Sequence, residues 1–214
     1  MTATQQGSAV APSRRTRRTE RRRGGGSKAL GVVAGLLLMG GAVGMQTLHL
    51  SDNELSDPLT YAGAKGEAVD ARRFSLRLDS LATAKSIQSG TSTVPTDQVF
   101  LIVTVSAKSS IKPYHLGQPV LVTADGKKFD ATDRVDNTLT LAQKWVQPDI
   151  WTSGRFFFEV PPSALADASV VFGLRASVVV ESYRPEVEID LGLDEDAARK
   201  LAASAQNVYS TDKK

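Results

Sequence analysis

Residues 99–105 read VFLIVTV, and every residue in this run except Thr104 is apolar. A strand with one face in water alternates apolar and polar residues, whereas a short continuous apolar run is typical of a strand that is covered on both faces. The sequence therefore predicts a central, doubly covered strand at this position.

Further strand patterns lie on both sides of this run. Residues 73–79 alternate polar and apolar side chains, which predicts a half-buried strand. Asp125 and Gly126 follow the apolar residues 120–122 and predict a hairpin, because glycine accepts positive φ. Residues 155–160, RFFFEV, stop at two prolines, which cannot continue a strand ladder. Three more strands are predicted at residues 169–174, 177–181 and 186–191.

Seven or eight short strands with turn signals between them favour a mainly β fold. We expect an immunoglobulin-like antiparallel β-sandwich over residues 67–193, followed by a short C-terminal helix and tail over residues 194–214. Asp194 can cap this helix, since Glu195 and Asp196 occupy its first turn. Its apolar face is mostly alanine, which predicts weak packing or extension into solvent.

The N-terminal fifty residues have the composition of a membrane anchor. Residues 1–28 hold eight of the 26 Lys and Arg and one of the 23 acids, a net charge of +7, which leaves 18 bases and 22 acids (−4) for the rest. We expect a disordered basic cytoplasmic tail over residues 1–28, a transmembrane helix (signal anchor) over residues 29–50 and a polar linker over residues 51–66. A helix of 22 residues would extend about 33 Å, enough to cross a hydrocarbon core of about 30 Å.

A cleavable signal peptide is the alternative for the same segment. The small residues Ala42 and Gly44 stand three and one before a potential cleavage point, and cleavage would release a secreted protein. The chain contains no cysteine, which excludes a lipid anchor on cysteine and any disulfide.

Few residues carry recognisable chemistry. Tyr114, His115 and Trp145 form a candidate binding surface for carbohydrate or peptide, whereas Trp151 directly precedes an apolar strand and is predicted to pack. Any Ser-His-acid triad would have to use His115, because His49 lies at the expected bilayer edge. No G-x-S-x-G motif supports such a triad. We therefore expect no catalytic residues and no cofactor.

Acidic residues cluster at Asp125, Asp130, Asp133 and Asp136, and oxygen ligands of this kind can hold calcium. Their spacing does not match a calcium loop with ligands on alternate residues, so turn and strand-edge positions explain them more simply. We expect no metal site.

Two segments resemble a known family. Residues 125–129, DGKKF, and residues 151–161, WTSGRFFFEVP, resemble the D-G-K hairpin and the following apolar strand of bacterial exported domains of unknown function with a telokin-like, immunoglobulin-type sandwich. The likeness covers residues 67–191. It implies a β-sandwich behind a membrane anchor or lipoprotein signal, with a binding or accessory role and no enzymatic activity.

These observations predict a single-pass membrane protein with its N-terminus in the cytoplasm and its sandwich outside. We expect a binding or accessory module of the bacterial cell envelope that contacts the lipid bilayer through residues 29–50 and an envelope protein or cell-wall partner through the sandwich. Nucleic acid is not expected, because the basic charge lies in a tail without a folded reader. The alternative is an envelope hydrolase with an unrecognised site.

Overall fold

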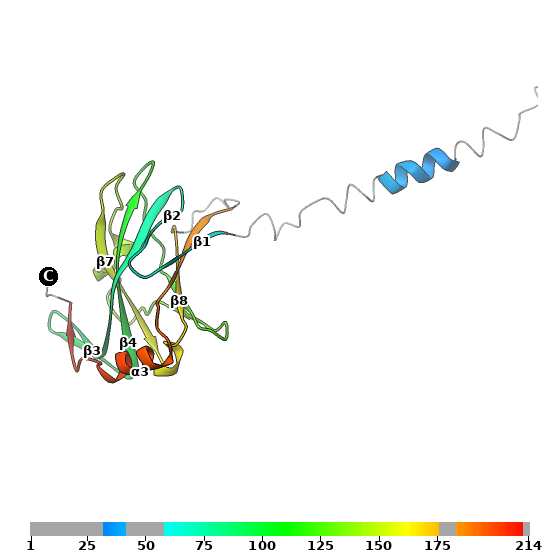
Figure 1. Ribbon diagram of the computed structural model, residues 1–214. Helices are drawn as coiled ribbons and strands as arrows, with labels where there is room; N and C mark the ends of the chain where they lie inside the picture. The colour runs from blue at the N-terminus through cyan, green and yellow to red at the C-terminus, as the bar shows by residue number, and fades with distance from the viewer. Residues whose placement is uncertain (1–31, 42–57, 176–182, 212–214) are drawn as a thin grey trace, which may run out of the picture. The chain divides into compact units, whose positions relative to one another are not determined.

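The computed structural model describes residues 32–41, 58–175 and 183–211. The chain divides into two units, Met1–Leu50 and Ser51–Lys214. A helix over residues 32–41 belongs to the first unit, and two sheets with a C-terminal helix form the second (Figure 1). Within the described ranges, no helix has the length and apolar character needed to cross a membrane. Most of the predicted span, 29–50, lies outside the described residues.

The first sheet has the strand order β1-β9-β8-β5-β6. Its strands are β1 (Leu59–Ala64), β5 (Val120–Val122), β6 (Lys128–Asp130), β8 (Ser169–Gly173) and β9 (Pro185–Asp190). The predicted hairpin between β5 and β6 is confirmed: Gly126 has a φ of 78° and its N–H donates to Thr123 O at 2.8 Å. The strand predicted at residues 177–181 lies outside the described residues.

The second sheet has the order β10-β3-β4-β7, and β2 pairs with a further part of β3. Its strands are β2 (Ala68–Asp70), β3 (Phe74–Ser89), β4 (Ser92–Ser109), β7 (Thr152–Val160) and β10 (Tyr209–Ser210).

The described part of the second unit also contains three 3₁₀ helices and one α-helix: η1 (Asn137–Leu139), η2 (Leu141–Gln143), η3 (Pro162–Ala164) and α3 (Glu195–Ala203).

Most strand pairs are antiparallel, as predicted, but two pairs are parallel. β1 runs parallel to β9, and β10 runs parallel to β3. β1 lies within the segment predicted as a linker, residues 51–66, so the sandwich begins at or before Leu59. Its residues are largely exposed, with Tyr61 packed partly against the core, and this leaves little apolar alternation from which a strand could be predicted.

The predicted central strand is confirmed as part of β4, which lies between β3 and β7. Leu101, Val103 and Val105 are fully buried in the core between the two sheets. Phe100 and Ile102 point to the other face and are buried in a second apolar cluster. Both faces of this strand are therefore covered.

The connection from β6 to β7 provides much of the second cover. Val135 and Leu139 from this connection pack in the second cluster, and Tyr209 of β10 packs against it as well. The same connection protects the outer edge of β7: Thr132 N donates to Phe157 O at 2.8 Å, and Lys144 Nζ donates to Ser153 O at 3.0 Å. A sheet edge that would otherwise invite pairing with another chain is thus occupied.

The predicted capping of the C-terminal helix is confirmed, and the helix packs on the core through one buried and several partly buried side chains rather than extending into solvent. Asp194 Oδ1 accepts from Ala197 N at 2.7 Å, and Ala198 is buried against the main core. Thr83 Oγ1 donates to Leu201 O at 2.6 Å, and β10 then pairs with β3. The helix lies at one end of the sandwich (Figure 1). Its alanine side chains are small and let it approach the core closely.

Gly154 tests the close packing at the β7 edge. A Cβ at this position would lie 2.7 Å from Leu141 Cβ and 3.0 Å from its Cα, since η2 lies directly against the strand. We expect Gly154→Ala to lower the free energy of unfolding by about 1–3 kcal/mol. In thermal unfolding of the full chain in detergent, followed by near-ultraviolet circular dichroism, this corresponds to a midpoint lower by about 3–10 °C.

Gly173→Ala is the matched control, because its Cβ would meet Glu186 Cγ at an ordinary 3.5 Å. We expect that variant to melt near the wild-type temperature. Equal midpoints for both alanine variants would contradict the packing argument.

Candidate functional site

The structure brings together two of the three residues predicted as a binding surface. Tyr114 and Val146 form an antiparallel bridge, which places His115 opposite Trp145. The rings of His115 and Trp145 lie 3.9 Å apart between centroids. Tyr114 points to the other side and packs partly against the main core, because neighbouring residues of an extended chain face opposite ways. Trp145 is 57% exposed, and a binding role for this surface stays a prediction.

The ring of His115 packs against Trp145, and no hydrogen bond to a carboxylate is seen among the described residues. Its Nδ1 is buried and has no hydrogen-bond partner among the residues that the structure describes. In a Ser-His-acid triad, one ring nitrogen is oriented by a carboxylate. The described surroundings of Nδ1 contain no such bond.

Trp151 is predicted to pack as core or edge cover, and it does not lie in the core between the sheets. Its side chain is 40% exposed on the outer side of the second sheet. The guanidinium of Arg77 lies 5.4 Å from the centroid of its ring, and Lys108 Nζ lies 5.5 Å away. Cations at this distance are attracted to the negative face of an indole. The missed signal was the outward alternation of the polar residues on β3, which places Arg77 on the same face.

A register shift in β3 holds Arg77 in place. The ladder between β3 and β4 is irregular between Leu78 and Ser80, and Asp79 is the extra residue. Asp79 Oδ1 accepts from Arg77 Nε at 2.7 Å, and its Oδ2 accepts from Ser106 Oγ at 2.5 Å. A bulge often redirects a side chain in this way.

An open cleft of about 750 Å³ lies beside the far end of β7. Its walls come from β4, from β6 and the segment after it, and from the end of β7; the lining residues are Gln98, Phe129, Asp130, Ala131, Thr132, Asp133, Arg134, Glu159 and Pro161. Three carboxylates and one guanidinium give this cleft a net charge of −2. Asp130 and Asp133 are exposed and make no ion pair with another described residue.

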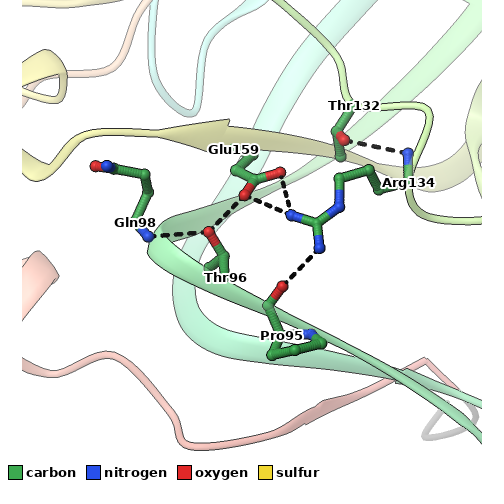
Figure 2. A network of polar contacts seen from close by, with 6 residues as sticks. All are labelled: Pro95, Thr96, Gln98, Thr132, Arg134 and Glu159. Carbon is green, nitrogen blue, oxygen red and sulfur yellow. Dashed lines mark hydrogen bonds and ion pairs between the residues drawn. The ribbon is translucent and has the colours of Figure 1, made fainter.

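An ion pair forms one wall of the cleft and fixes its shape. Arg134 Nη1 donates to both carboxylate oxygens of Glu159 at 2.6 and 2.7 Å, and Nη2 donates to Pro95 O at 2.9 Å. Figure 2 shows the continuation of this network, in which Thr96 Oγ1 donates to Glu159 Oε1 at 2.6 Å and accepts from Gln98 N at 3.0 Å. The network joins the β6–β7 connection to β4 and β7.

The partners of Glu159 outweigh the effect of its partial burial. Desolvation raises the pKa of this carboxyl, but the hydrogen bonds from Thr96 and Arg134 and the charge of Arg134 lower it below the ordinary 4.5. Glu159 is therefore ionised at neutral pH, and its charge is matched by Arg134. The carboxylates available to a ligand in the cleft are Asp130 and Asp133.

The other acids of the predicted cluster are engaged locally. Asp125 accepts hydrogen bonds from Lys127 and Thr123, which lower its pKa to about 2. Asp136 Oδ1 accepts from Thr138 N at 2.9 Å. In the part of the chain that the structure describes, no three His, Asp or Glu side chains are grouped so that they could hold a metal ion.

The sequence matches no protein-family model and no curated protein. The structure is similar to a candidate lipoprotein (ycdA) from Bacillus subtilis, with 17% identity and a TM-score of 0.46 over 66% of this chain and 42% of that one. The yjhA protein of Bacillus subtilis has 13% identity and a TM-score of 0.45, over 59% of this chain and 99% of its own. The secreted protein MPT63 of Mycobacterium tuberculosis has 13% identity and a TM-score of 0.41, over 63% and 98%.

The chain thus covers less than half the length of the first of these proteins. At such low identity the likeness concerns the fold alone. The resemblance of residues 125–129 and 151–161 to exported telokin-like domains agrees with the two packed sheets of this chain, and membership of that family stays a prediction.

The Arg134–Glu159 pair should make stability depend on pH. Because the pKa of Glu159 is lowered on folding, its contribution is present above pH 4.5 and is lost as pH falls through the folded-state pKa. At pH 7 we expect Glu159→Gln to lower the free energy of unfolding by about 1 kcal/mol, since the pair is partly exposed. The difference from wild type should shrink below pH 4.5.

Asp133→Asn is the control, because this carboxylate has no described partner. Urea unfolding of the full chain at several pH values measures both variants. A deficit for Glu159→Gln that does not change with pH would contradict the assignment.

Proposed function

We propose that this chain is a single-pass, membrane-anchored module of the bacterial envelope, whose β-sandwich lies outside the cytoplasm and binds an envelope partner without catalysis. The helix over residues 32–41 is the observation that carries the anchor. Its six large apolar side chains are all between 57% and 76% exposed: Val32, Val33, Leu36, Leu37, Leu38 and Met39. A helix that is apolar around its whole circumference is stable when lipid surrounds it.

The charge distribution supports the orientation. Seven arginines and one lysine precede the apolar segment, and the chain after residue 28 carries a net charge of −4. Positive residues next to a membrane span stay on the cytoplasmic side. The N-terminus is therefore assigned to the cytoplasm and the sandwich to the outside.

The acidic cleft is the surface best suited to a partner. It is concave, it carries Asp130 and Asp133 without described ion pairs, and Phe129 and Pro161 add apolar surface beside them. The Arg134–Glu159 pair joins the segments that form its wall, and such contacts reduce the ordering that a ligand would require. We infer that the partner presents a cationic segment, from an envelope protein or from a cell-wall polymer that bears ammonium groups.

Two charged residues in the apolar segment should abolish membrane retention. We expect the wild-type chain to stay in the membrane pellet after washing with alkaline carbonate, with its C-terminal unit open to external protease. The Leu37→Arg, Leu38→Arg chain should be lost from the membrane pellet, because each arginine costs about 2.5–3.5 kcal/mol at the centre of a span.

The control is Leu37→Ala, Leu38→Ala, which adds no charge and should be retained. Mass spectrometry of the mature N-terminus accompanies the wash. A chain that begins after Gly44 and appears in the medium would overturn the anchor in favour of a cleaved signal.

Charge reversal in the cleft should abolish partner binding. Asp130→Lys with Asp133→Lys changes the net charge of the cleft from −2 to +2. A photo-crosslinking residue in place of Gln98, which lines the cleft without a charge, reports contacts in intact cells. We expect crosslinked adducts when Asp130 and Asp133 are intact. These adducts should be lost in the Asp130→Lys, Asp133→Lys chain.

The same crosslinker in place of Lys85, which is exposed on β3, is the control for random contact. Mass spectrometry of the adduct separates a protein partner from a cell-wall polymer. Adducts of equal strength in the reversed chain would refute the cleft as the binding surface.

A further inference from the structure

One end of the sandwich gathers the exposed apolar side chains. β3 and β7 begin at this end and β4 finishes there, because Phe74 pairs with Ser109 and Ala107 with Thr152. β1 and β9 begin at the same end, because their first residues line one hollow with Arg72 and Arg73. We call it the aromatic end and define it by Leu59, Tyr183 and the segments 70–79, 108–115 and 144–151. α3 lies at the opposite end (Figure 1).

Six of the seven large apolar residues that are exposed on the described part of the sandwich belong to the aromatic end. They are Leu59, Ile111, Trp145, Ile150, Trp151 and Tyr183, and Val208 is the seventh. Ile111 and Ile150 are 70% and 61% exposed, in two segments that the Ser109–Pro148 and Tyr114–Val146 bridges join. Clustered exposure of this kind marks a contact surface, whereas single exposed residues need no explanation.

Basic residues surround these side chains. The segments 70–79, 108–115 and 144–151 hold six bases and three acids, a net charge of +3, although the chain after residue 28 has a net charge of −4. One of the three acids, Asp79, is paired with Arg77. Lys112 Nζ lies 5.6 Å from the ring centroid of Tyr114, next to the exposed Ile111. The positive charge of the sandwich is therefore concentrated where its apolar side chains are exposed.

The chain also enters the sandwich at this end. β1 begins at Leu59, and only residues 51–58 separate it from the predicted span 29–50. Eight residues reach at most about 28 Å when fully extended. On the anchor proposed above, a tether of this length would hold the start of β1 within about 28 Å of the bilayer surface.

We propose that the aromatic end docks on the outer surface of the membrane, with its tryptophans and isoleucines in the interface and its basic residues on anionic lipid headgroups. Tryptophan and tyrosine favour the membrane interface, and lysine and arginine near it are attracted by anionic lipids. The proposal rests on the membrane anchor proposed above for the position of the tether.

The details favour lipid over a carbohydrate polymer. A sugar ring stacks on an open aromatic face, but Arg77 and Lys108 lie over the ring of Trp151. Ile111 and Ile150 offer no hydrogen bonds to hydroxyl groups, yet they gain by leaving water for hydrocarbon. In a bilayer, the cations would contact the headgroups while the apolar side chains beside them contact the acyl chains.

The experiment uses the full chain reconstituted into vesicles, with its two tryptophans as reporters, both of which lie at the aromatic end. Vesicles of brominated phosphatidylcholine are prepared with and without phosphatidylglycerol, and bromine quenches a tryptophan that enters the interface. We expect strong quenching with phosphatidylglycerol, and quenching about threefold weaker without it or in high salt.

Lys108→Glu with Lys112→Glu should weaken the quenching to the level without phosphatidylglycerol. Lys85→Glu with Lys200→Glu makes the same change in charge away from the aromatic end, since Lys200 is exposed on α3, and should leave quenching as in wild type. Near-ultraviolet circular dichroism verifies that each variant is folded.

Flotation of the vesicles separates the two proposals. A chain that floats with tryptophans that stay unquenched overturns the docking and leaves the anchor. Equal quenching in neutral and anionic vesicles, or in both lysine variants, also overturns the docking on anionic lipid. A chain that does not float at all overturns both.

Discussion

Strand β4 is apolar on both faces, and this constraint requires two separate covers in one sandwich. The first sheet covers one face, where Leu101, Val103 and Val105 are fully buried. The β6–β7 connection and β10 cover part of the other face, over Phe100 and Ile102. Burying each such side chain contributes about 1.5–3 kcal/mol, so the outer cover adds to the stability that packing against the first sheet provides.

The extent of the outer cover determines where the cleft forms and where Trp151 stays exposed. The connection crosses β7 on its way back to that strand, and the Arg134–Glu159 pair holds it there, which leaves the cleft between the connection and the strand end. The cover does not reach the beginning of β7. There the same sheet face is polar, with Arg77 and Ser106 in place of apolar residues, and Trp151 lies exposed on it.

Local patterns predicted the elements whose cause is local. The run at residues 99–105, the glycine at 126, the prolines after β7 and the cap at Asp194 each act through their immediate neighbours. β1 was missed because its residues are largely exposed, and β10 because it has only two residues; both pair with strands distant in sequence. The cleft was missed for the same reason, since Arg134 and Glu159 are 25 residues apart.

β7 connects the two surfaces physically. It begins next to Trp151 at the aromatic end and carries Glu159 near its other end at the cleft. Trp151 and Glu159 are eight residues apart, or about 26 Å in an extended chain. Three consecutive phenylalanines, 156–158, are buried on alternate faces between these positions, and both edges of the strand are occupied. A strand that is held in this way resists bending, so the positions of its two ends are coupled. If the aromatic end docks on the membrane as proposed, this strand would therefore set the distance of the cleft from the bilayer.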